Sequence, residues 1–446
     1  MGYAHGALTD YSGDSAQYLG IATRAPWSSD FLLASKPWTV PLLYKLAGGR
    51  LHAGYAQFAA SIASWLALAA VAAAIVRERR VGIAAAVLVL LFSLSIWITQ
   101  WDKLVLSESL SVSLAAAAVA AWMALVTWPR ALTLAAALVI TLLWVFTRDT
   151  NAYVLLFALA PLAVWLVRSS QTRRIAAIAL VGAAAVAAAS LESASAGQGC
   201  FESGSPVRFE PSKHAALAAR GFCVRRWYTL VNTIGVRIVP DSQARSYFVA
   251  RGMPVPPLMR RLSGQLLGIV PNTYSDPSMA GFRHWLDAHG RQTYASYLLS
   301  HPGEIVPSGG VLDALVSPHY STKRVFPPLT QWRGPARQVL PGPVQSVVFP
   351  PTTLCLGIEL AIAAALIAAA LRRRARLARA WVVPAFLVVV TPLHALVVWH
   401  GDPADVTRHA LLVGVLARLG LLLLALLAAG ALATRTRGRA SGTSRP

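Results

Sequence analysis

Residues 61–98 read SIASWLALAAVAAAIVRERRVGIAAAVLVLLFSLSIWI, two long apolar runs with Arg77, Arg79 and Arg80 between them. A helix of about 20 apolar residues is long enough to cross a bilayer. Short loops rich in arginine and lysine stay on the cytoplasmic side. The stretch therefore predicts a helical hairpin in a membrane, with its turn in the cytoplasm.

Basic residues recur at every second boundary between apolar runs. They are Arg130; Arg168, Arg173 and Arg174; Arg372 to Arg374 with Arg376 and Arg379; and the tail from Arg435 to Arg439. The alternate boundaries carry most of the conspicuous acidic residues and must then face outward. We predict an all-α polytopic protein of a bacterial inner membrane, with a cytoplasmic C-terminus and an ionisable outer face.

Nine apolar runs are long enough to span a membrane, near 55–76, 81–101, 106–126, 131–147, 150–168, 175–191, 347–371, 380–399 and 409–433. This count places the first extracytoplasmic segment at 1–54, a bundle of six spans at 55–191 and a large extracytoplasmic insert at 192–346. A bundle of three spans at 347–433 and a basic cytoplasmic tail at 434–446 complete the predicted chain.

Composition excludes a soluble globular protein, since 56% of the residues are hydrophobic and the mean hydropathy is +0.55. The net charge of +22 follows in large part from cytoplasmic arginines that meet anionic membrane lipids. We therefore expect no nucleic-acid partner. The excess of arginine over lysine and the abundance of alanine suggest a GC-rich bacterial genome, as in actinobacteria.

The chain begins on the predicted outer side, with neither a signal peptide nor a span before Asp10. We expect a start site placed too late, so that an upstream helix is missing. The alternative is an N-terminus that crosses the membrane unaided.

Two of the three cysteines, Cys200 and Cys223, lie in the predicted insert. An oxidising compartment permits a disulfide between them that closes a loop of about 24 residues; two free thiols are the alternative. The third, Cys355, fits a small core residue. His284 and His289 lack a helical ligand spacing, so we predict no zinc site and no required cofactor, and a divalent cation is not indicated.

The first outer segment contains Asp10 and Asp14, and Asp14 stands directly before a helix-like stretch at 15–23. Asp14 fits a helix N-cap. It also fits a general base at the membrane surface, because Tyr18 follows four residues later on the same helical face.

Ionisable residues also mark the later outer boundaries. Asp102, Lys103 and Glu108 lie at the second outer boundary, around the start of the third apolar run, where a carboxylate suits a helix start. Arg148 and Asn151 follow the fourth run; Arg148 fits an interfacial anchor paired with Asp149, or a fork onto a lipid phosphate. The last outer boundary carries Asp402, Asp405, Arg408 and His409, and the latter two face the outer cavity or the lipid head groups.

These motifs resemble the GT-C superfamily of membrane glycosyltransferases, which use polyprenyl-phosphate sugars. Asp14 matches the first acid of that family's outer-loop motif and Tyr18 its aromatic residue, while Ser15 stands where a second acid is common. An acid at the second outer boundary and the Arg148 motif fit the same resemblance, which covers residues 10–170.

The resemblance implies an inverting hexosyl- or pentosyltransferase that builds cell-envelope glycan on the outer face. It implies Asp14 as the general base, with Asp10, Asp102 and Glu108 as secondary candidates. The donor phosphate would contact Arg148, Lys103, Lys36 and Arg418, and the substrate cavity would include Tyr18, Asn151, Arg408 and His409. The expected partners are a polyprenyl-phosphate sugar, membrane lipids, and a glycan, lipid or protein acceptor.

Alternatives remain open. A flippase or transporter for a lipid-linked precursor would carry polar mid-membrane residues and internal repeats. A polymerase or ligase that uses lipid-diphosphate donors would rely on Arg408 and His409. Glu359 and Arg418 lie inside apolar runs, where charges usually face a cavity or each other; we expect a structural pair, or else Arg418 on the donor phosphate.

Overall fold

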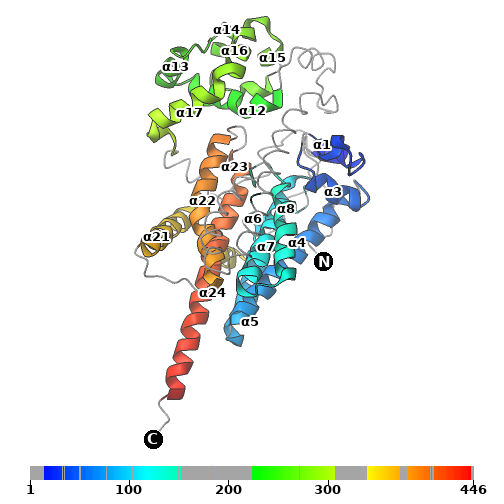
Figure 1. Ribbon diagram of the computed structural model, residues 1–446, viewed down its shortest axis with the longest axis vertical. Coiled ribbons are helices and arrows are strands. Elements are labelled where there is room, and N and C mark those ends of the chain that lie inside the picture. Colours follow the sequence, from blue (N-terminus) through cyan, green and yellow to red (C-terminus); the bar gives the residue numbers. More distant parts are fainter. Residues whose placement is uncertain are drawn as a thin grey trace.

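The computed structural model describes residues 15–32, 34, 36–49, 52–76, 78–102, 104–148, 150–151, 182, 224–270, 272–306, 339–371, 379–401, 403 and 406–442. Within these ranges the secondary structure is helical and contains no strand, as expected (Figure 1).

Five helical stretches in the described part of the chain are long and apolar enough to cross a membrane. They are α4 (Ala53–Ile75), α7 (Ser107–Thr127), Gly342–Ile362, α22 (Val382–Gly401) and the Leu411–Thr434 part of α24 (Leu411–Gly442). Gly342–Ile362 joins α20 (Gly342–Val348) to the first half of α21 (Thr352–Leu371). The helices support a membrane protein, whereas two of the nine predicted spans, 150–168 and 175–191, lie almost wholly outside the described residues.

The predicted span at 81–101 is interrupted. Helix α5 (Arg79–Ser93) ends early, and a separate short helix, α6 (Ile96–Thr99), follows it. The Gln345 side chain donates to the Ser95 hydroxyl at 2.7 Å and accepts from the Ile96 N–H at 3.2 Å. These contacts satisfy polar groups at the break, so the chain can turn there inside the bundle.

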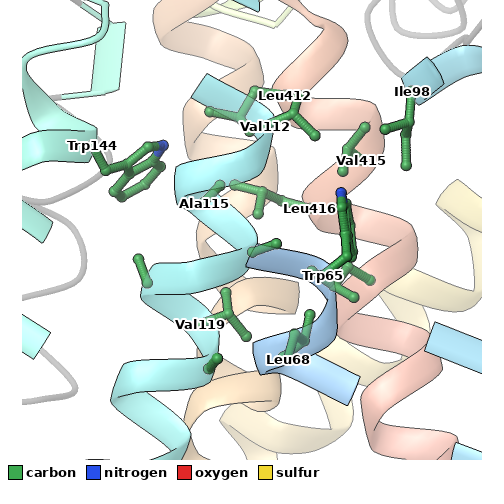
Figure 2. Packing of buried hydrophobic residues seen from close by; sticks show 14 of the residues in the cluster. Trp65, Leu68, Ile98, Val112, Ala115, Val119, Trp144, Leu412, Val415 and Leu416 are labelled. Carbon is green, nitrogen blue, oxygen red and sulfur yellow. The ribbon is translucent and has the colours of Figure 1, made fainter. Parts of the chain in front are cut away.

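The core of the bundle is centred on α7, which packs against α4 and against α8 (Ala131–Val145). Figure 2 shows Trp65 of α4, Val112 and Val119 of α7, and Leu416 of α24 around one another. Alanines at 115–118, 120 and 121 of α7 are buried. Small residues let helices approach closely, which favours van der Waals packing in a membrane.

Most of the described part of the predicted insert lies at 224–306, which has its own apolar core that includes Trp227, Phe248, Phe282 and Leu286. In Figure 1 it lies beyond the ends of α22 and α23 (Val406–His409). Its elements are α12 (Val224–Thr233), η1 (Ile234–Ile238), α13 (Ser242–Val249), α14 (Pro257–Arg261), η2 (Leu267–Ile269), α15 (Asn272–Ser275), η3 (Pro277–Met279), α16 (Ala280–Trp285), η4 (Leu286–Gly290), α17 (Arg291–Ser300) and η5 (Pro302–Glu304). We call residues 224–306 the helical cap.

The remaining described elements are short. They are α1 (Ser15–Ala22), α2 (Ser29–Leu32) and α3 (Thr39–Leu46) near the start of the chain, and η6 (Arg379–Trp381) before α22. Helix α3 packs against α1 and α4, so the first described segment lies against the bundle.

Candidate functional site

Four charged or titratable side chains meet where α7 begins, α8 has just ended and α23 ends. The Arg408 Nε donates to the Glu108 Oε1, and the Arg148 Nη1 lies 3.5 Å from the same oxygen. The Arg148 Nη2 lies 2.6 Å from the His409 Nδ1. We call these four residues the Glu108 cluster; the structure brings them together from segments as much as 300 residues apart.

The Glu108 cluster holds more positive than negative charge. Glu108 is fully buried and is shared by two guanidinium groups that are themselves almost fully buried. A buried carboxylate is stable only when it is paired, and the start of α7 adds a favourable helix dipole. Within these four side chains, one carboxylate faces two arginines, so the cluster presents guanidinium groups that can bind an anion.

Polar atoms next to the cluster have unused hydrogen-bonding capacity. The amide nitrogen of Asn151 donates to Ser111 and Thr147, whereas its Oδ1 is buried without a partner in the described part of the chain. The same holds for both ring nitrogens of His394, which interacts electrostatically with Arg148. Buried polar atoms normally have a partner, so these groups are available to water or a polar ligand.

Asp102 lies in the short connection before α7, six residues before Glu108, and contacts Ser109, the residue that follows Glu108. It is buried, accepts a 2.6 Å hydrogen bond from the Ser109 hydroxyl and also interacts with Ser61. Burial raises the pKa of Asp102 to about 7, although both serines oppose that shift. Asp102 therefore exchanges its proton near neutral pH.

The raised pKa of Asp102 predicts a pH-dependent stability. Between pH ~4 and pH ~7 the folded chain binds more protons at this residue than the unfolded chain. Its contribution is thus full below pH ~4 and is lost as the pH rises to about 7, by up to ~1.4 kcal/mol per pH unit. We expect Asp102→Asn, which stays neutral, to flatten this dependence in thermal unfolding measured from pH 4 to 8. Equal slopes for the two proteins would contradict the prediction.

The first described segment packs against the same end of the bundle. The Ser15 hydroxyl donates to the Val105 carbonyl at 2.7 Å, and the Tyr44 hydroxyl contacts the Leu106 carbonyl at 3.1 Å. Tyr18 is buried, and the Lys36 Nζ lies 5.7 Å from the centre of its ring. The predicted site residues Tyr18 and Lys36 are therefore brought together beside the chain that leads into Glu108.

Arg418 lies deeper in the bundle and has different partners. Its guanidinium donates to the carbonyl oxygens of Pro350 and Gly414 at 3.1 and 2.9 Å, and lies over the Phe349 ring. It also interacts electrostatically with Glu359. Arg418 is seven residues inside α24, about 10 Å from the start of that helix, so these contacts fit a structural role.

Several predicted site residues lie outside the described part of the chain. They are Asp10, Asp14, Lys103 and the proposed disulfide partners Cys200 and Cys223. No group of three or more potential metal ligands occurs among the described residues.

Sequence reasoning missed two features of the site. The Ser109 and Ser61 contacts of Asp102 carry no recognisable motif, because serines in an apolar helix are common. His394 had a usable signal: it is an ionisable residue inside an apolar run, and such residues in a membrane span are candidates for function.

Comparison with protein-family models, with curated proteins and with solved structures finds no match to this chain.

Proposed function

We propose that the chain is an inverting glycosyltransferase that moves a sugar from a polyprenyl-phosphate donor to an acceptor outside a bacterial inner membrane. The observation that carries this proposal is the Glu108 cluster, a buried group with two arginines for one carboxylate at the end of an apolar bundle. A lipid-linked phosphate needs both features, since its tail lies in the membrane and its head group is anionic.

The two arginines would bind the donor phosphate. Arginine forms paired, charge-assisted hydrogen bonds with phosphate oxygens. Glu108 fixes the orientation of both guanidinium groups, each of which carries several N–H donors. During transfer, the bond from the anomeric carbon to the phosphate oxygen breaks, and the departing phosphate keeps the electron pair. Prearranged cations stabilise the charge that develops there.

The acceptor hydroxyl needs a base, and we propose Asp14 for this role. The acceptor oxygen attacks the anomeric carbon while its proton passes to the carboxylate, and this single displacement inverts that carbon. The hydrogen bond from Ser15 to the Val105 carbonyl supports the assignment. Ser15 directly follows Asp14, and Val105 lies between Asp102 and Glu108 in the sequence. Asp102, which lies in the described part of the chain, is an alternative base, and Asp10 is another candidate.

A polymerase or ligase that uses lipid-diphosphate donors is the second candidate. It is favoured by one observation, the presence of Arg408 and His409 in the same cluster as Arg148. A diphosphate carries more negative charge, which a second guanidinium and an imidazole would match.

We expect purified full chain in lipid nanodiscs to transfer sugar from a member of a panel of polyprenyl-phosphate sugars to an envelope-glycan acceptor. Arg148→Lys should lower kcat/KM by about 10- to 100-fold, since lysine keeps the charge but loses the fork. The measurement is transfer of radiolabelled sugar, and Arg251→Lys, an exposed arginine of the helical cap, should leave the rate unchanged.

Two results would overturn the proposal. Transfer from lipid-diphosphate sugars alone would favour the polymerase or ligase. Absence of transfer, together with movement of a lipid-linked precursor across proteoliposomes, would favour a flippase.

A further inference from the structure

A pocket of about 80 Å³ lies between the helical cap and the end of α22, apart from the Glu108 cluster. Its size admits several waters or part of one larger ligand. The polar and aromatic residues that line it include Arg237, Asp241, Tyr294, Glu304, Trp399 and His400.

Hydrogen bonds between the helical cap and the end of α22 hold the walls of the pocket in place. The Arg237 Nη2 donates to the Trp399 carbonyl at 2.8 Å, and its guanidinium carbon lies 3.3 Å from the centre of the Trp399 ring. The His400 Nε2 lies 2.9 Å from the Ile305 carbonyl, and its Nδ1 lies 2.8 Å from the Tyr294 hydroxyl. The pocket is therefore built before any ligand arrives.

The same contacts fix the proton positions. A carbonyl only accepts, so the His400 Nε2 carries a hydrogen and donates to Ile305. Burial raises the pKa of Tyr294 to about 12, which keeps its hydroxyl protonated. The hydroxyl then donates to the Nδ1, and His400 is neutral in this arrangement.

Charge and hydrogen-bonding capacity define the ligand. The Arg237 Nη1 is buried and makes no hydrogen bond of its own in the described part of the chain, while the guanidinium also interacts with the Tyr294 hydroxyl and with Glu304. Two exposed carboxylates, Asp241 and Glu304, line the same pocket. An anion would meet both carboxylates, and a cation would meet Arg237. A neutral ligand with several hydroxyl groups can accept from the arginine and donate to the carboxylates at once.

We infer that this pocket binds a neutral saccharide unit. Aromatic side chains with convergent polar groups are typical of small-molecule sites, and here the polar groups suit hydroxyls. His400 and Arg408 are eight residues apart, so the pocket lies within about 28 Å of the Glu108 cluster. The saccharide is an acceptor glycan only if the proposed transferase function holds; its binding does not depend on that function.

The test is direct binding to full chain in nanodiscs with no donor present. We expect neutral oligosaccharides of hexoses or pentoses to bind in isothermal titration or saturation-transfer NMR, and acidic saccharides to bind more weakly. Glu304→Gln and Arg237→Lys should each weaken binding by about tenfold, the worth of one charge-assisted hydrogen bond. The matched control is Asp287→Asn, an exposed carboxylate of the cap outside this pocket.

Three results would overturn the inference: no binding of neutral saccharides, tighter binding of acidic ones, or unchanged affinity in both variants. Because Glu304 is exposed, Glu304→Gln should keep the wild-type melting temperature and so separates lost binding from lost folding. Saccharide binding without sugar transfer would refute the transferase and leave the pocket assignment standing. Sugar transfer without saccharide binding would refute the pocket assignment and leave the transferase function standing.

Discussion

Glu108→Gln is expected to lower the free energy of unfolding by about 3–5 kcal/mol, the usual cost of removing one partner from a buried ion pair. Glu108 is fully buried and pairs with Arg148 and Arg408. Without the carboxylate, two guanidinium groups face each other at the end of the bundle. Part of the loss should return in the double variant Glu108→Gln/Arg408→Gln, because it removes one of the stranded charges.

Unfolding by a denaturing detergent, followed by circular dichroism, measures this loss. Glu78→Gln is the matched control, since Glu78 is also buried and caps α5 by accepting from the Val81 N–H. Loss of a cap costs about 1 kcal/mol. A Glu108→Gln variant no less stable than Glu78→Gln would show that the Glu108 cluster is not a coupled, buried network.

Sequence patterns were sufficient for the long helices of the described chain. The apolar runs near 55–76, 106–126 and 380–399 correspond closely to α4, α7 and α22, because run length alone sets the number of residues needed to cross a membrane. The break between α5 and α6 was not predictable. It depends on Gln345, which is 250 residues from its partner Ser95, and no local pattern specifies such a contact.

In the candidate site, too, the sequence predicted which residues take part but not which residues they contact. Charge sidedness selected Glu108, Arg148, Arg408 and His409, and the structure places them together. Their pairing was not predictable, since helical periodicity gives the face of a residue but not its partner on another helix. The hydrogen bond from Arg418 to the Pro350 carbonyl illustrates this, because every residue has a backbone carbonyl and no side-chain pattern identifies which one accepts.

Asp14→Asn is expected to lower the rate of sugar transfer by about 10²–10⁴-fold, the range over which general-base catalysis acts. Folding should be intact, as judged by the melting temperature. Asp30→Asn is the matched control, an exposed acid of α2 in the same segment, and should transfer sugar at the wild-type rate. Wild-type turnover by Asp14→Asn would exclude Asp14 as the base.

The pH profile then decides among the remaining acids. Glu108 is held by two arginines, which suits a positioning residue better than one that must receive a proton. Burial raises the pKa of Asp102 to about 7, so transfer that depends on ionised Asp102 must fall as the pH drops through that value. A profile that stays flat from pH 6 to 8, with activity lost in Asp14→Asn and kept in Asp102→Asn, would assign the proton transfer to Asp14. A profile that falls through pH 7 in the wild type, with activity lost in Asp102→Asn, would assign it to Asp102, because a base must be ionised before it can accept the proton.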